Sequence, residues 1–257
     1  MKEARPLALV TGASSGIGAE LAVELARAGH DLILTGRDAG RLAEAAARVI
    51  AAGAAAETRV LDLDDGSSVE ALVGAVGSRP LAVLVNNAGF GISGPFAEAQ
   101  PARLAAMVAL NITALTLLTR AFLPEMIGRG SGRILNVAST AAFQPCPGMA
   151  GYGATKAYVL SLSEAIAEEV AGTGVTVTAL CPGATDTRFA DRASMGASRL
   201  FRKTSSASEV ARTAVKALLG GRRVRIAGWR NAVMAFSIRL APRTLVARIS
   251  ASMLRKA

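Results

Sequence analysis

The sequence is poor in the residues on which metal sites and disulfide frameworks depend. Its 257 residues include two cysteines, Cys146 and Cys181, and one histidine, His30. Cysteines this far apart, with no partner at metal-ligand spacing, build neither a disulfide framework nor a zinc site, so we expect no metal. A single histidine also leaves little room for histidine-based catalysis. We expect His30 at the surface, in the turn before the second strand.

Long apolar runs are also missing. The longest, such as Leu81–Val85, have about five residues, whereas a membrane-spanning helix needs roughly 20. Residues 1–6 hold no charged-then-apolar leader with a cleavage site, so we expect a cytoplasmic protein without a span. Since 51% of the residues are apolar and only 19% are charged, the composition excludes a disordered chain and suits one large domain.

Acidic residues are missing from the last part of the chain. The net charge is +10, and residues 222–257 hold nine basic residues and no acidic one. Nearly all of the excess charge therefore lies in this segment. A high positive charge is compatible with nucleic-acid binding, but the segment has no recognisable binding motif, so we expect no nucleic-acid partner.

Short apolar runs alternate with longer segments of helical period. Strands are predicted at Leu7–Val10, Asp31–Thr35, Glu57–Leu61, Leu81–Val85, Arg133–Val137, Val175–Leu180 and Val224–Ile226. Helices are predicted between them at Gly16–Ala28, Asp38–Ala51, Ser67–Val76, Pro101–Ile127, Tyr152–Ala171 and Glu209–Leu219. The strands are apolar rather than alternating, as expected where both faces of a sheet are buried. The pattern predicts an α/β fold: a Rossmann-like, doubly wound parallel sheet of about seven strands with helices on both faces.

We expect residues 1–228 to form a single dinucleotide-binding and catalytic domain and residues 229–257 a basic, amphipathic helical tail. The tail is predicted to form two helices broken at Pro242. One face of the second helix is apolar and holds Leu245, Val246, Ile249 and Met253. This tail could pack on the core or on a partner subunit. Alternatively, it could lie on anionic lipid, peripherally at the inner membrane surface.

A glycine-rich segment, Thr11–Gly18, follows the first strand and opens the first helix. Its glycines let the backbone turn tightly and approach a pyrophosphate, and the helix N-terminus supplies free amides. The residues expected to contact a dinucleotide are Gly12, Ser14, Ser15, Gly16, Ile17 and Gly18. A glycine-rich turn alone is also compatible with a purely structural role, but the order of strand, loop and helix favours the dinucleotide.

The end of the second strand indicates which dinucleotide is bound. NAD-selective folds place an acidic residue there to bind the ribose 2′-hydroxyl, whereas this sequence reads Thr35-Gly36-Arg37. Arg37 can pair with a 2′-phosphate, so we expect NADP(H) rather than NAD(H). Asp38 is instead well placed as the N-cap of the next helix. The alternative is that Arg37 is a solvated surface charge.

Tyr152 and Lys156 are four residues apart and so share one face of a predicted helix. A buried ammonium lowers the pKa of a neighbouring phenol, which then exchanges a proton near neutral pH. The pattern YxxxK is common by chance and gains its meaning from Ser139, at the end of the fifth strand. The Ser139 hydroxyl would reach a carbonyl or alcohol oxygen held beside Tyr152.

Together these features resemble the short-chain dehydrogenase/reductase family in its single-domain form, from about Leu7 to Thr187. Thr11–Gly18 matches the family's TGxxxGxG turn, and Tyr152 and Lys156 match its YxxxK pattern. The other matching positions are Asp62 and Leu63, the segment Asn86-Asn87-Ala88-Gly89, Asn111, Ser139, Pro182, Gly183 and Thr187. Thr185 departs from the family, which often has an aliphatic residue there.

The resemblance implies a role for each of these residues. Tyr152 would be the general acid and base, and Ser139 would hold the substrate oxygen. Lys156 would lower the Tyr152 pKa and bind the nicotinamide ribose, while Asn111 would support a water in a proton relay. The cofactor would be contacted by Asp62 at the adenine amine and further by Leu63, Asn87, Ala88, Gly89, Pro182, Gly183, Thr185 and Thr187.

By family analogy, the substrate is determined by residues after Ser139 and after Gly183. The candidates are Phe143, Gln144, Pro145 and Met149, and a lid from Phe189 to Lys203 with Arg188, Arg192, Arg199 and Arg202 at its rim. Their apolar character favours a carbonyl or secondary alcohol on an apolar molecule. The resemblance also implies a homodimer or homotetramer. The alternative function is a non-catalytic NADP-binding regulatory or scaffold protein, which the intact catalytic set disfavours.

Overall fold

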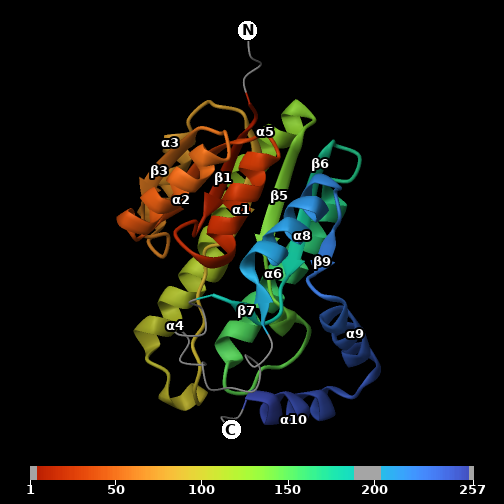
Figure 1. Cartoon of the computed structure of the whole chain (residues 1–257). Coiled ribbons are helices and arrows are strands. Elements are labelled where there is room, and N and C mark those ends of the chain that lie inside the picture. The colour runs from red at the N-terminus through yellow and green to blue at the C-terminus, as the bar shows by residue number, and fades with distance from the viewer. Residues whose placement is uncertain (1–4, 188–203, 255–257) are drawn as a thin grey trace.

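The structure is a computed structural model and describes residues 5–187 and 204–254. Seven parallel strands form the central sheet, in the order β3-β2-β1-β4-β5-β6-β9 (Figure 1). The strands are β1 Leu7–Thr11, β2 Asp31–Gly36, β3 Ala56–Val60, β4 Leu81–Asn86, β5 Gly132–Val137, β6 Val175–Cys181 and β9 Val224–Ile226. Two short strands, β7 (Thr185–Asp186) and β8 (Ser205–Ser206), pair outside this sheet. The strand order reverses between β1 and β4, which confirms the predicted doubly wound fold.

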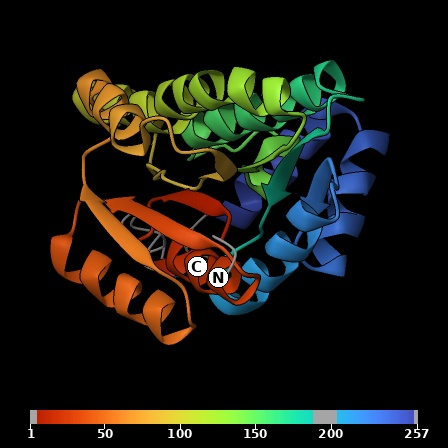
Figure 2. The same cartoon turned by 90° about the horizontal axis from the view of Figure 1, so that it is seen from above.

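Helices cover both faces of the sheet, as Figure 2 shows from above. One layer consists of α1 Gly16–Arg27, α2 Ala39–Ala51 and α8 Ala207–Leu219. The other consists of α3 Gly66–Val76, α5 Leu115–Arg129 and α6 Ala150–Glu169. Successive side chains of a strand point to opposite faces, so Leu9 packs in one layer and Val10 in the other. Two-sided burial is therefore the reason for the apolar strands.

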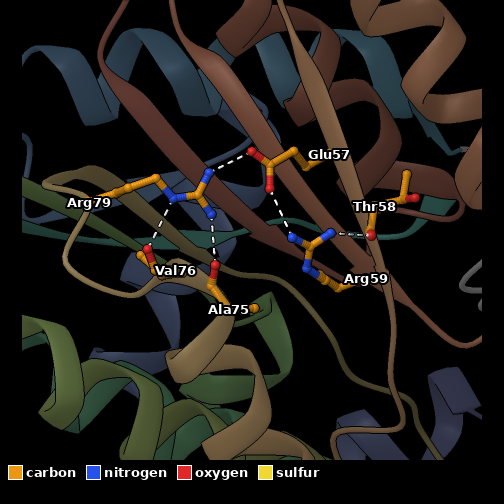
Figure 3. A network of polar contacts seen from close by, with 6 residues as sticks. All are labelled: Glu57, Thr58, Arg59, Ala75, Val76 and Arg79. Carbon is orange, nitrogen blue, oxygen red and sulfur yellow. Dashed lines mark hydrogen bonds and ion pairs between the residues drawn. The ribbon is translucent and has the colours of Figure 1, made fainter.

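β3 is an exception, because the prediction of apolar strands throughout is wrong at this edge of the sheet. It reads AETRV, and none of its side chains is fully buried. Glu57 of β3 forms ion pairs with Arg59 and Arg79. Arg79 also donates to the carbonyls of Val76 (3.0 Å) and Ala75 (2.7 Å) at the end of α3 (Figure 3). One guanidinium thus satisfies carbonyls that the helix end leaves free and ties α3 to the edge strand.

The segment predicted as one helix over Pro101–Ile127 is interrupted in the structure. A π-helical turn, η2 (Ala109–Ala114), joins α4 (Pro101–Val108) to α5 and contains Asn111. The whole stretch is long and apolar enough to cross a membrane by length and composition. Its inward side chains, such as Leu118 and Phe122, belong to the core on one face of the sheet. It is therefore a covering helix of the α/β fold.

His30 is buried, so its predicted surface position is wrong. Its side chain packs between the end of α1 and the start of β2, with Nδ1 3.3 Å from the carbonyl oxygen of Leu25. Burial lowers the pKa of His30, and the nearby charges of Arg133 and Arg5 act in the same direction. The ring is therefore a neutral part of the packed interior.

The tail folds as the predicted pair of helices. α9 spans Trp229–Ser237, a 3-10 turn, η5, covers Ile238–Leu240, and α10 spans Arg243–Leu254. The predicted apolar face of the second helix is divided. Val246 is buried, whereas Leu245 and Ile249 are 48% and 51% exposed, and the polar Ser250 takes an inward position instead.

A chain of polar side chains runs through the interior between β4, β5, α5 and α6. Asn86 and Asn136 face each other across the strands, and Asn86 Nδ2 donates to Asn136 Oδ1 at 2.9 Å and to Thr119 Oγ1 at 3.0 Å. Asn136 Nδ2 donates to Ser163 Oγ, whose hydroxyl donates to the carbonyl of Val159. Buried side-chain amides need hydrogen-bond partners. This polar network therefore fixes how α5 and α6 pack on the sheet.

Replacing Asn136 by alanine is expected to lower the free energy of unfolding by about 2–3 kcal/mol, because it leaves buried partners on both sides unsatisfied. Urea unfolding monitored by circular dichroism measures this loss. Thr178→Val on β6 is the matched control, because the buried Thr178 hydroxyl has no hydrogen-bond partner among the described residues. That variant should be as stable as the parent or more stable. A loss as large as that of Asn136→Ala would contradict the explanation.

Candidate active site

The carboxyl ends of the strands surround a cavity of about 260 Å³. All predicted site residues except Gly18 and Asn111 line it: Gly12, Ser14, Ser15, Gly16, Ile17, Arg37, Asp62, Leu63, Asn87, Ala88, Gly89, Ser139, Tyr152, Lys156, Pro182, Gly183, Thr185 and Thr187. They come from segments far apart in the sequence. The parallel sheet brings them together because its strands all end at the same edge.

The glycine-rich turn approaches the loop after β4 so closely that side chains are excluded. A Cβ on Gly18 would lie 2.3 Å from the carbonyl oxygen of Gly12 and 2.4 Å from Nδ2 of Asn87. Gly12 and Gly16 also have φ values of +64° and +57°, which favour glycine. Ser15, the N-cap of α1, makes no capping hydrogen bond, and the first turn has no acidic residue. The helix N-terminus can therefore receive an anion.

Thr11 holds the two turns together. Its Oγ1 accepts hydrogen bonds from the backbone amides of Asn87 and Ala88, both at 3.0 Å, and donates to the carbonyl of Val85. Asn87 Nδ2 returns hydrogen bonds to the carbonyls of Thr11 and Gly12. Thr11 was absent from the predicted site residues, although its position at the head of the TGxxxGxG pattern signalled it.

Arg37 and Asp62 meet at the far end of the cavity. Arg37 Nη1 lies 3.2 Å from Asp62 Oδ2, and both side chains are partly exposed. Asp38 caps α2 by accepting from the Arg41 amide, as predicted, and so leaves Arg37 as the group at the end of β2 that can meet an anion. Oδ1 of Asp62 is buried and has no hydrogen-bond partner among the described residues. This end of the cavity thus offers one guanidinium and one free acceptor.

Ser139, Tyr152 and Lys156 meet at the other end. Ser139 and Tyr152 share a side-chain hydrogen bond, and Ser139 Oγ also accepts from the Ala141 amide at 3.1 Å. Lys156 Nζ donates to the carbonyl of Val137 at 2.7 Å and lies 5.8 Å from the centre of the Tyr152 ring. All three side chains are buried. A hydroxyl pair therefore lies at the cavity wall with a cation behind it.

Burial dominates the protonation of these groups. It raises the pKa of Tyr152 to about 12, against a smaller lowering by the hydrogen bond with Ser139. Burial also lowers the pKa of Lys156 to about 8. The prediction that Lys156 lowers the Tyr152 pKa is thus wrong for this structure. The ammonium donates to the Val137 carbonyl, and Lys156 is not among the groups that shift the Tyr152 pKa.

Asn111 sits in the π-helical turn and does not line the cavity. Its Oδ1 accepts from the Phe90 amide at 3.1 Å, and its Nδ2 donates to the Phe90 carbonyl and to Thr155 Oγ1. The side chain therefore joins the loop after β4 to α6. The sequence did not single out Phe90 or Thr155, since neither belongs to a recognised pattern.

The Tyr152 end of the cavity is lined mainly by apolar side chains. They are Phe90, Leu110, Ala141, Cys146 and Met149, with Gln144 and Ser250 as polar neighbours. Of the predicted substrate residues, Gln144 and Met149 line the cavity. Phe143 instead packs in a core cluster, and Pro145 is not part of the lining. The predicted lid from Arg188 to Lys203, with Phe189, lies outside the described residues.

Cys146 and Ser250 are additions to the predicted set. Burial raises the pKa of Cys146 to about 11, so its thiol is neutral and forms part of the apolar wall. Ser250 is buried and reaches the cavity from α10, and no pattern in the sequence connected it with the site.

The fold and the site together define a dinucleotide-binding oxidoreductase of the doubly wound class. Residues 6–197 match the family model described as short chain dehydrogenase, and the chain belongs to this family. Membership makes the protein an NAD(P)-dependent enzyme of the short-chain dehydrogenase type.

Relatives support the assignment along most of the chain. An uncharacterized oxidoreductase of Staphylococcus saprophyticus is 37% identical over 82% of this chain and 90% of its own length. A solved short-chain dehydrogenase from Sphingobium yanoikuyae, in complex with NADPH, is 36% identical with a TM-score of 0.83 and covers 93% of this chain and 94% of that one. The bulky-bulky ketone specific alcohol dehydrogenase from Comamonas testosteroni is 30% identical, with a TM-score of 0.78 and coverage of 91% and 92%.

The lowered pKa of Lys156 predicts a pH-dependent stability. Between about pH 8 and the pKa near 10.5 of an exposed lysine, the unfolded chain binds more protons than the folded chain. The stability of the parent should therefore rise relative to Lys156→Met over this interval. The free energy of unfolding of Lys156→Met, relative to that of the parent, should be highest below pH 8 and should fall as the pH rises.

Urea unfolding at four values between pH 7 and 10 measures this difference. Lys216→Met removes an exposed lysine from α8 and is the matched control. A parent that gains no stability relative to Lys156→Met between pH 8 and 10 would contradict the buried ammonium.

Proposed function

We propose that the protein transfers a hydride between NADP(H) and a carbonyl or secondary alcohol on an apolar substrate. The observation that carries the proposal is the hydrogen-bonded pair of Ser139 and Tyr152, backed by the buried Lys156, at one end of a cavity. The glycine-rich turn lies along the same cavity. This arrangement suits proton transfer beside a bound dinucleotide.

The residues present fit a dinucleotide. The turn at Gly12 and Gly18 leaves a cradle without side chains, and the N-terminus of α1 supplies amides for a pyrophosphate. The unpartnered Oδ1 of Asp62 can accept from the adenine amine. Leu63, Asn87, Ala88, Gly89, Pro182, Gly183, Thr185 and Thr187 continue the lining towards Tyr152.

Arg37 supports NADP(H) over NAD(H). Its guanidinium can take a 2′-phosphate once it turns from Asp62, and an exposed ion pair of this kind costs roughly 0–1 kcal/mol to break. The strand end offers no free carboxylate for a 2′-hydroxyl, because Asp38 caps α2. The Sphingobium yanoikuyae neighbour was solved with NADPH, which agrees with this choice.

When bound, the nicotinamide supplies or accepts the hydride. Tyr152 then gives the proton to the substrate oxygen during reduction, and its high pKa keeps the phenol protonated and ready to donate. Ser139 holds the same oxygen by its hydroxyl. Lys156 uses one donor on Val137 and keeps others for the ribose hydroxyls. Asn111 positions α6 against the loop after β4, beside the expected proton relay.

An apolar substrate suits the Tyr152 end of the cavity. Apart from Lys156, the described residues lining this end carry no charge. Phe90, Leu110 and Met149 offer apolar contact instead. The bulky-bulky ketone specific neighbour from Comamonas testosteroni is a relative with a ketone as its substrate.

Homo-oligomerisation through α5 and α6 remains part of the proposal. Leu117 of α5 and Tyr158 of α6 are 45% and 38% exposed, and Tyr158 hydrogen-bonds to Thr116 across the two helices at 3.0 Å. Exposed apolar side chains on adjoining helices suit an interface between copies of the chain.

Tyr152→Phe is expected to lower kcat by about 10²–10⁴-fold, because it removes the proton donor without changing the ring. The Kd for NADPH should stay within about threefold, since the phenol contributes little to binding a dinucleotide of this size. Absorbance at 340 nm with a panel of apolar ketones measures kcat. Tyr158→Phe, at the only other tyrosine, is the control and should keep full activity. Retained turnover in Tyr152→Phe would contradict the enzymatic role and favour a non-catalytic protein.

Arg37→Ala is expected to weaken NADPH binding by roughly 10–100-fold, because one charge-assisted pair with the 2′-phosphate is lost. Binding of NADH should change little. Isothermal titration calorimetry with both dinucleotides gives the ratio of the Kd for NADH to the Kd for NADPH. Arg48→Ala, which removes a surface arginine paired with Glu20, is the control. An equal loss of affinity for NADPH and NADH would show that Arg37 does not bind the 2′-phosphate.

A further inference from the structure

An apolar stripe lies exposed on the tail. Six of the fourteen large apolar side chains that the described residues leave exposed fall within residues 229–249. Four of them form what we call the apolar stripe: Trp229, Val233, Phe236 and Leu240. They are 73%, 61%, 62% and 77% exposed. Their spacing of four, three and four residues places them on one helical face, while Ala235 is buried on the other side of α9.

Arginines adjoin the apolar stripe at both of its ends. Arg230 directly follows Trp229, Arg239 directly precedes Leu240, and both are exposed. The Arg230 guanidinium lies over the Trp229 ring, 5.3 Å from its centre. Within the described part of the chain, neither arginine forms an ion pair. The surface thus combines unpartnered positive charge with unburied apolar area.

α10 continues this surface next to the cavity. Its outward residues Leu245 and Ile249 are half exposed, and Arg243 and Arg248 are exposed beside them. Its inward residue Ser250 lines the cavity. α10 lies at the end of the molecule opposite the N-terminus (Figure 1). The tail is also fixed to the domain, since α9 packs against β9 and against η3 (Thr140–Phe143).

We propose that α9, η5 and α10 dock on the surface of a lipid bilayer that contains anionic phospholipids. An apolar stripe with tryptophan, bordered by arginines, is the pattern of a helix that lies in the plane of the membrane interface. The stripe enters the acyl boundary while the arginines reach the phosphates. Residues 222–257 hold no acidic residue that would repel this surface.

Charge also argues against a second copy of the chain on this face. A twofold contact would bring the same arginines of two subunits together, and residues 222–257 supply no acidic residue to separate them. A bilayer with anionic lipid supplies both the apolar and the negative component that the surface requires. The proposal concerns the tail and does not depend on the chemistry proposed for Tyr152.

Trp229 is the only tryptophan of the chain, so its fluorescence reports on the docking surface directly. The full-length protein is titrated with vesicles of phosphatidylcholine alone and of phosphatidylcholine with phosphatidylglycerol. The anionic vesicles should shift the Trp229 emission to shorter wavelength and reduce its quenching by acrylamide roughly twofold or more, because the ring leaves water. High salt should reverse the shift.

Flotation with the same anionic vesicles tests whether the apolar stripe and its arginines are needed for binding. Trp229→Ser with Phe236→Ser, and separately Arg230→Gln with Arg239→Gln, should each reduce the bound fraction about tenfold or more. The matched control is Ile50→Ser with Val60→Ser, which removes two exposed apolar side chains elsewhere and should bind as the parent does. Unchanged unfolding midpoints show that the variants are folded.

Several outcomes would overturn the proposal. They are an unchanged Trp229 spectrum with anionic vesicles, binding to neutral vesicles equal to that to anionic ones, or an equal loss of vesicle binding in the Ile50→Ser and Val60→Ser control. A Trp229 emission that is already at short wavelength in buffer, and that shifts on dilution, would show that a second copy of the chain covers the stripe instead.

Discussion

The contact on which the site depends is the close approach of the glycine-rich turn to the loop after β4. Gly18 has room for no side chain between the Gly12 carbonyl and the Asn87 amide. Thr11 then ties both turns together with one hydroxyl. This contact lies where the strand order reverses, at the carboxyl ends of the paired strands β1 and β4. Both turns line the cavity, next to the N-terminus of α1.

Chemical reactivity in this fold comes from removing water around a few polar groups. Burial drives both Tyr152 and Lys156 toward their neutral forms, and the hydrogen bond with Ser139 opposes this only in part at Tyr152. A protonated phenol is suited to give a proton to a substrate oxygen. The residues around it are mainly apolar, and this is the basis of the proposal that the substrate is apolar.

The tail has two sides with different surroundings. Inward, Val246 and Ser250 of α10 are buried, and Ser250 reaches the cavity. Outward, the apolar stripe and its arginines face solvent. A helix can have a buried side and an exposed side because its side chains point in all directions around its axis. The side chains of a strand instead alternate between two faces. The wall of the active site and a candidate membrane surface are therefore neighbouring parts of the tail.

Periodicity and local motifs in the sequence determined the strands, most helices and the glycine-rich turn, because each depends on neighbours along the chain, and the family resemblance supplied most of the residues that line the cavity. The tertiary structure decided what depends on distant neighbours. It buried His30, removed Phe143 from the cavity, paired Arg37 with Asp62 and brought Ser250 into the lining. It also reversed the expected direction of the Tyr152 pKa. The exposure of a side chain to water depends on residues distant in the sequence, so it cannot be predicted from a single segment.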